Sequence, residues 1–320
     1  MIKKQHSEIY SNILSQLADG ATFQEARPLP GSFSNETTLL TYETAAGCQQ
    51  VVVRRYAVFG SYNRGEKAER EFKALALCQQ HNIPAPTPLL LDKSGALLGS
   101  PGIVTSFVPG RQQIRPPDEA TWVAELAHTL ARIHAIPITA EKAFLLNGNQ
   151  EVTWFLNGGS VTEAMARHPD GTAVWHAVHD LLPTIRPVSS ALMHVDFWNG
   201  NLLWQDQRLT AVLDWEEASF GDPAYDVAYL RHELAMLGGA RLADAFLAAY
   251  VAENGRPVDN LAFWELTAAA RFMPDPEGMI PEWQALQAGT YEVAAVQQNF
   301  RSFLASALKR AGATMEKNSD

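Results

Sequence analysis

The fold is decided by one stretch, His194-Val195-Asp196-Phe197-Trp198-Asn199-Gly200-Asn201, with Asp214 thirteen residues beyond its end. The stretch has the pattern His-x-Asp-x-x-x-x-Asn. Between it and Asp214, two short apolar runs flank the polar turn 205–208, which predicts a β-hairpin inset among helices. A loop and an adjacent hairpin can bring Asp196, Asn201 and Asp214 to one site.

These three side chains suit the transfer of a phosphoryl group. The reaction needs a carboxylate that orients and deprotonates the attacking hydroxyl, and metal ions that neutralise the β- and γ-phosphates. Asp196 suits the first task, while Asn201 and Asp214 offer the hard oxygen ligands that Mg²⁺ prefers. The competing interpretation is a buried turn that His194 and Asp196 brace, with Asn201 in a left-handed backbone conformation.

The rest of the chain divides into two parts. Before the Pro109-Gly110 turn, the pattern predicts strands at 38–42, 50–56 and 103–108 and a helix at 66–80. After it, helices are expected at 118–136, 224–237, 242–252, 261–272 and 281–311, and all eight tryptophans lie at or after position 122. We therefore expect a small α/β lobe at 1–108 and a larger, mainly helical lobe at 109–320.

The composition fits a folded protein with two lobes that share a cleft. The chain has 320 residues, 47% hydrophobic and 19% charged, and single cores stop growing at about 250 to 300 residues. Its net charge of −10 argues against nucleic acid or anionic membranes as partners and favours a cationic or neutral small molecule. Two cysteines make neither a disulfide framework nor a zinc site.

No targeting segment is evident in the sequence. The first fourteen residues contain no apolar run typical of a signal peptide. We expect no later segment to approach the ~20 apolar residues that span a bilayer. A cytoplasmic location is the resulting expectation.

A second block, Asp214-Trp215-Glu216 and then Gly221-Asp222-Pro223-Ala224-Tyr225-Asp226, carries a family resemblance. With the first stretch, it resembles the central motif of the aminoglycoside phosphotransferase and choline kinase family. That resemblance covers most of the chain. It implies an α+β, two-lobed, protein kinase-like fold, in which the smaller lobe binds the nucleotide and the larger one carries the catalytic and acceptor-binding residues.

The resemblance also assigns roles. It makes Asp196 the catalytic base and Asn201 and Asp214 the metal ligands, while Asp222 and Asp226 are structural. The family usually has Gly where Val195 stands and often His-Pro at 198–199, so the loop surface that faces the acceptor is expected to be bulkier here.

In the smaller lobe, the expected phosphate-covering loop is Gly31-Ser32-Phe33-Ser34-Asn35, with Ser32 and Asn35 as nucleotide contacts. It contains one glycine and is equally consistent with an ordinary loop. In the strand Ile103 to Val108, the resemblance assigns the backbone of Ser106 and Val108 to the nucleotide base. A core strand that ends in a turn explains the same residues.

Arg54 and Glu71 are the expected ion pair beside the nucleotide. Side chains alternate along a strand, so only one of Arg54 and Arg55 points into the cleft, and we choose Arg54. Glu71 shares a helix face with Leu75 and Cys78, which requires a charged partner. The alternatives are two solvated arginines, a partner role for Glu69, or an exposed Glu71.

The leading hypothesis is an enzyme that transfers the γ-phosphoryl group of ATP or GTP, with Mg²⁺, to a small-molecule acceptor. Acceptors in the family include aminoglycosides, amino alcohols and sugars. A pocket for the acceptor is expected after Asp226, where Glu233 and Arg271 are among the informative residues. A nucleotide-binding pseudokinase is the alternative, and a protein kinase is disfavoured because Asp-Phe-Gly and Ala-Pro-Glu are missing.

Overall fold

The computed structural model describes residues 2–29, 35–57, 63–138, 143–273, 275–287 and 289–319. The chain forms two compact units. The first comprises Met1–Gly110 and Thr210–Glu217, and the second comprises Arg111–Leu209 and Ala218–Asp320. The segment Thr210–Glu217 thus belongs to the same unit as the N-terminal part of the chain.

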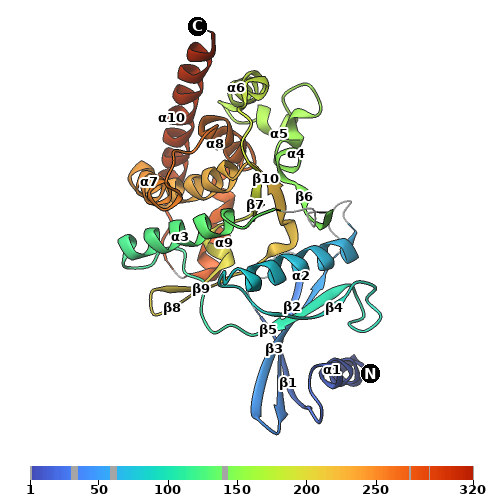
Figure 1. Cartoon of the computed structure of the whole chain (residues 1–320). Helices are drawn as coiled ribbons and strands as arrows, with labels where there is room; N and C mark the ends of the chain where they lie inside the picture. Colours follow the sequence, from blue (N-terminus) through green and yellow to red (C-terminus); the bar gives the residue numbers. More distant parts are fainter. Residues whose placement is uncertain are drawn as a thin grey trace. The chain divides into compact units, whose positions relative to one another are not determined.

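The first unit is built on a five-stranded antiparallel sheet of order β1-β2-β3-β5-β4 (Figure 1). Its elements are α1 (Ile2–Leu17), β1 (Thr22–Pro28), β2 (Asn35–Thr44), β3 (Gly47–Tyr56), α2 (Arg64–Gln80), β4 (Pro88–Asp92) and β5 (Gly102–Ser106). The predicted ribbon is confirmed, since β2 and β3 pair with Thr38 opposite Val53. Helix α1 and strands β1 and β4 were not predicted. Helix α1 packs Tyr10, Ile13 and Leu14 into the core of this sheet.

The second unit is mainly helical. Its helices are α3 (Glu119–His134), α4 (Gly148–Val152), α5 (Glu163–Ala166), α6 (Gly171–Leu181), α7 (Ala224–Asn254), α8 (Leu261–Ala270), α9 (Ile280–Leu286) and α10 (Val293–Ser319). The short strands β6 (Leu146–Asn147), β10 (Ser219–Gly221) and β7 (Ala191–Met193) form a three-stranded sheet in that order. The predicted hairpin is confirmed as β8 (Leu202–Gln205) and β9 (Arg208–Val212).

Two helix predictions need correction. The helices expected at 224–237 and 242–252 are one element, α7, which kinks at Gly239, where φ is 73° and ψ is −175°. Only glycine adopts that conformation without strain. The single helix expected at 281–311 is wrong, because Gln287 is extended and separates α9 from α10.

Helix α7 also corrects the expectation that no segment is long and apolar enough to span a bilayer. By length and hydropathy, α7 meets that criterion, but a buried core helix of a folded protein meets it too. Three of its buried residues, Asp226, Arg231 and Glu233, are charged types with partners inside the second unit.

Candidate active site

The loop that follows β7 is held by a carboxylate of α7. The backbone N–H groups of His194 and Val195 donate to the two oxygens of Asp226, at 2.7 and 2.9 Å. Val195 has a φ of 73°, which is costly for a β-branched residue. Asp226 is fully buried, and its bonds hold this strained turn in place.

The predicted base, Asp196, accepts a hydrogen bond on each carboxylate oxygen. The hydroxyl of Tyr229 donates to Oδ1 at 2.7 Å, and Nδ2 of Asn201 donates to Oδ2 at 2.9 Å. The same amide nitrogen donates to the backbone carbonyl of Asp196 at 3.0 Å. Because both of these bonds use its nitrogen, the amide of Asn201 points its oxygen away from Asp196, where it is suited to a metal ion.

Arg271 contributes a positive charge beside the base. Its Nη2 lies 4.0 Å from Oδ1 of Asp196, and its guanidinium lies 5.3 Å from the ring centre of Tyr229. The side chain is 37% exposed, which leaves it accessible to small molecules. Arg271 was among the residues expected in an acceptor pocket, and the structure brings it to the predicted base.

Asn199 ties the middle of the loop to two helices. Its backbone N–H and its Nδ2 both donate to Oε2 of Glu233, at 3.1 and 2.7 Å. The indole N–H of Trp122 donates to its Oδ1 at 3.2 Å. Burial raises the pKa of Glu233 to about 8, against the opposing effect of the bonds from Asn199. The loop is thus fixed at its start, at Asp196 and at its middle.

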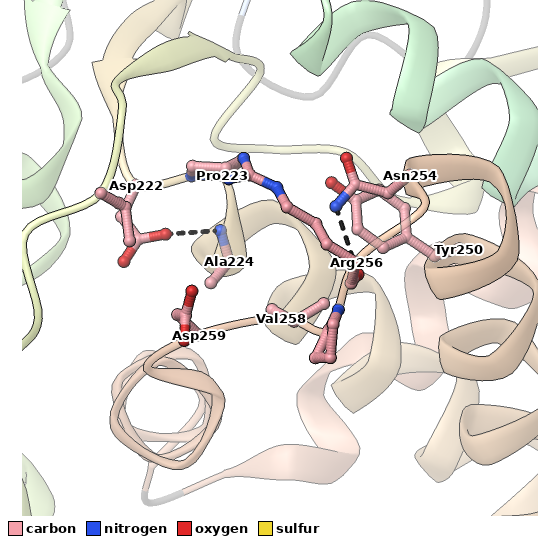
Figure 2. Close-up of a pocket in the computed structure, with 10 residues that line it drawn as sticks. Asp222, Pro223, Ala224, Tyr250, Asn254, Arg256, Val258 and Asp259 are labelled. Atoms are coloured by element: carbon pink, nitrogen blue, oxygen red, sulfur yellow. Dashed lines mark hydrogen bonds between the residues drawn. The ribbon is translucent and has the colours of Figure 1, made fainter.

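Asp222 has a structural position, as the resemblance implied. Its Oδ1 accepts from the backbone N–H of Ala224 at 3.0 Å at the start of α7, as Figure 2 shows. Its Oδ2 accepts from Trp264 and Asn260 at 2.7 and 2.8 Å. Asp222 also lines the surface pocket of Figure 2, whose lining includes none of the residues predicted for catalysis, metal or nucleotide binding.

In the first unit, Arg54 makes the predicted ion pair and two more. Its Nε lies 3.3 Å from Glu71, and its Nη2 lies 2.5 Å from Asp214 and 3.2 Å from Glu216. Arg55 pairs with a different residue, Glu36, so Arg54 is the arginine that meets Glu71, and its contact with a nucleotide stays a prediction. The alternative partner, Glu69, instead pairs with lysines at the surface.

Sequence reasoning assigned no role to Glu216 or to Lys67, which are both members of this cluster. The Oε1 of Glu216 lies 3.0 Å from Nζ of the buried Lys67, and its Oε2 accepts from Asn35 at 2.7 Å. Arg70 donates to its backbone carbonyl at 2.7 Å. The available signal was the placement of Lys67, Arg70 and Glu71 on one turn of α2, three charged residues that face the interior together.

The charges of this cluster shift the protonation of two carboxyl groups in opposite directions. Burial raises the pKa of Glu71 to about 7, although Arg54 opposes the shift. Burial would also raise the pKa of Glu216, but Arg54 and Lys67 lower it overall. The charge partners therefore favour the ionised form of Glu216, whereas burial opposes the ionisation of Glu71.

The cluster fits a divalent metal ion. Glu71, Asp214 and Glu216 offer carboxylate oxygens that all lie within 4.8 Å of one another. Such hard, anionic oxygens suit Mg²⁺. Asp214 has a φ of 66°, a conformation that aspartate and asparagine adopt more readily than most residues. Asp214 lies after β9, directly before the 3-10 helix η5 (Trp215–Glu217), and Glu216 lies within η5.

The remaining predicted nucleotide contacts have different outcomes. Ser32 lies outside the described residues. Asn35 is engaged with Glu216, as described above. The backbone N–H of Ser106 donates to the carbonyl of Thr87 at 2.9 Å, so this group already has a partner in the residue before β4. Val108 lies just beyond the end of β5, and its contact with a nucleotide stays a prediction.

Comparison with known proteins gives a consistent picture. Residues 25–262 match the model of the phosphotransferase enzyme family. A structure of aminoglycoside 2'-phosphotransferase-IIIa in complex with GDP has a TM-score of 0.62 at 18% identity and covers 93% of this chain and 98% of its own. The choline kinase from Streptococcus pneumoniae has a TM-score of 0.58 at 19% identity and covers 95% and 99%. The predicted α+β, protein kinase-like fold is confirmed.

Relatives found by sequence match only part of this chain and only part of their own length. Acyl-CoA dehydrogenase family member 10 of Mus musculus is 26% identical over 204 residues, which cover 59% of this chain and 19% of that protein. The chain therefore matches about a fifth of that relative's length. Hygromycin-B 4-O-kinase of Escherichia coli is 54% identical over 37 residues, which cover 12% of this chain and 11% of that protein.

Proposed function

The chain belongs to the phosphotransferase enzyme family, and from that premise we propose that it transfers the γ-phosphoryl group of ATP or GTP to a hydroxyl of a small molecule. The observation that carries the proposal is the state of Asp196. Its carboxylate is held on both oxygens, by Tyr229 and Asn201, and remains 28% exposed. A general base needs this combination of fixed orientation and access to the hydroxyl.

The residues of the first unit support the binding of a metal–nucleotide complex. Asp214 with Glu71 and Glu216 would hold Mg²⁺, which neutralises the phosphate oxygens when bound. Arg54 has a planar guanidinium suited to phosphate oxygens. Because Arg54 is bound to Asp214 here, a cation at Asp214 would compete with it and leave the guanidinium available for the phosphates.

The support for the chemical class of the acceptor is less direct. The solved relatives named above include an aminoglycoside phosphotransferase and a choline kinase, and the net charge of −10 favours neutral or cationic acceptors. A cytoplasmic location and the absence of nucleic-acid or membrane partners stay predictions. The alternative, a pseudokinase without turnover, is disfavoured by the retention of Asp196, Asn201 and Asp214 together.

The test is Mg²⁺-dependent release of ADP or GDP across a panel of aminoglycosides, macrolides, amino alcohols and sugars. We expect one acceptor class to stimulate release, and Asp196→Asn to abolish the stimulation. Asp206→Asn is the matched control, because Asp206 is exposed in the turn of the β8–β9 hairpin. Nucleotide binding without release for any acceptor would favour the pseudokinase.

A further inference from the structure

The predicted base has a partner that lies outside the sequence motif. Tyr229 is on α7, 33 residues after Asp196, and its phenol donates to Oδ1 of that residue at 2.7 Å. Only 5% of Tyr229 is exposed, while the accepting carboxylate of Asp196 is partly exposed, so the bond is part-buried. A hydrogen bond to an ionised group is stronger than one between neutral groups.

The direction of the phenol is fixed by the packing of its ring. The ring stacks on Tyr225 with a centroid distance of 5.8 Å and contacts Phe272 at 5.7 Å. The guanidinium of Arg271 lies 5.3 Å from its centre. Three neighbours on α7 and after α8 therefore hold the ring, which leaves the hydroxyl with one orientation toward Asp196.

The phenol stays protonated in this position. Burial raises the pKa of Tyr229, and the negative charge of Asp196 raises it further. Tyr229 is therefore a donor and not a second base. Since Asn201 donates to the other oxygen, the carboxylate of Asp196 has a donor on each side and its rotation is restrained.

We propose that Tyr229 is a positioning residue for phosphoryl transfer, which fixes the orientation of the Asp196 carboxylate toward the acceptor hydroxyl. This inference rests on the proposed function, in which Asp196 is the base. Tyr229 acts through Asp196 and takes no proton itself. The role explains why a polar hydroxyl is buried on the apolar helix α7 at this point.

The first test is Tyr229→Phe, which keeps the ring and removes the donor. We expect kcat to fall roughly 10- to 100-fold, the effect of losing one hydrogen bond to a charged group. The KM for the nucleotide and the thermal midpoint should stay close to those of the wild type. Tyr42→Phe is the control, because Tyr42 is a buried tyrosine of β2 and takes no part in the contacts of Asp196, so the turnover of this variant should change less than roughly twofold.

A double-mutant cycle distinguishes positioning from an independent effect. If Tyr229 acts through Asp196, then Tyr229→Phe should change the residual turnover of Asp196→Asn less than roughly twofold. Equal losses in the wild-type and Asp196→Asn backgrounds would overturn the proposal. So would wild-type turnover in Tyr229→Phe alone.

Infrared spectroscopy on protein labelled with ¹³C-aspartate supplies a readout that does not need turnover. The carboxylate band of Asp196 is the one that Asp196→Asn removes, and Tyr229→Phe should shift it. An unshifted band would overturn the contact itself. Absence of transfer by the wild type would overturn the proposed function and this role with it, whereas transfer that Tyr229→Phe leaves intact would overturn this role alone.

Discussion

The two clusters that carry the proposed chemistry are held together by different forces. In the first unit, Arg54 and Lys67 face the carboxylates of Glu71, Asp214 and Glu216, so the cluster is a set of ion pairs. In the second unit, the carboxylates of the loop and of α7 accept from neutral donors: backbone N–H groups, amides and a phenol.

This difference indicates how each cluster responds to ligands. A metal ion or a phosphate can replace one member of an ion pair, because its charge has the same sign as that of the member it displaces. No such ligand replaces a backbone N–H. We therefore expect the first cluster to rearrange when a metal–nucleotide complex binds, and the loop of the second unit to keep its structure.

The substitution Asp226→Ala, which removes the carboxylate that holds the loop after β7, should have the largest effect on stability. The change leaves the N–H groups of His194 and Val195 buried without an acceptor and removes the partner of His134 at 3.3 Å. The free energy of unfolding should fall by about 3 to 5 kcal/mol. Urea unfolding followed by tryptophan fluorescence measures it.

The control for this experiment is Asp244→Ala on the same helix. The side chain of Asp244 is 67% exposed and pairs with Arg231, so its loss should cost less than about 1 kcal/mol. Equal effects of the two substitutions would mean that neutral donors do not hold the loop, and the comparison between the clusters would fail.

The substitution Asp214→Asn should have the next largest effect, which is on ligand binding by the first unit. Asparagine tolerates the positive φ of this position, so the backbone should persist. The affinity for the Mg²⁺–nucleotide complex should fall roughly 100-fold, because one anionic ligand is lost. Calorimetric titration measures it, with Asp196→Asn as the variant whose affinity should be unchanged. Equal affinities of the two variants would contradict the division of roles.

Glu71→Gln tests the ion pair with Arg54 and should have a smaller effect. Loss of this partner loosens Arg54, and nucleotide affinity should fall roughly tenfold. Glu69→Gln, two residues earlier on α2, is matched in chemistry but pairs only with the exposed Lys73 and Lys93. Its affinity should equal that of the wild type. A larger effect at Glu69 than at Glu71 would reverse the assignment.

The sequence predicted those parts of the site that depend on local order. The spacing from Asp196 to Asn201 and the alternation that selected Arg54 are properties of a loop and a strand, so they are visible in the chain. Lys67 and Tyr229 were missed because their roles depend on which distant residue they meet: Lys67 pairs with Glu216, 149 residues later.

The fold shows the same division. The β2–β3 ribbon and the β8–β9 hairpin follow from local alternation and turn residues. Strand β4 was missed because its run contains Pro88 and begins in a proline-rich segment, although it pairs with β5. The break between α9 and α10 is set by Gln287, whose backbone N–H still bonds to Trp283 while its chain turns extended. Residue periodicity does not report such a break.

The smallest expected effect is a pH dependence that belongs to the loop alone. Burial raises the pKa of Glu233 from an ordinary 4.5 to about 8, so the folded chain keeps this proton after the unfolded chain has lost it. The resulting stability is complete below about pH 4.5 and is lost as the pH rises through 8. Glu233→Gln can still accept from Asn199 and never ionises, so the wild type should lose stability relative to it by about 1 kcal/mol between pH 5 and 6. Urea unfolding at both pH values measures the difference, with the exposed Glu163→Gln as control. A constant difference across this range would show that Glu233 is ionised in the folded chain, and the loop would then depend on a buried charge, as the first cluster does.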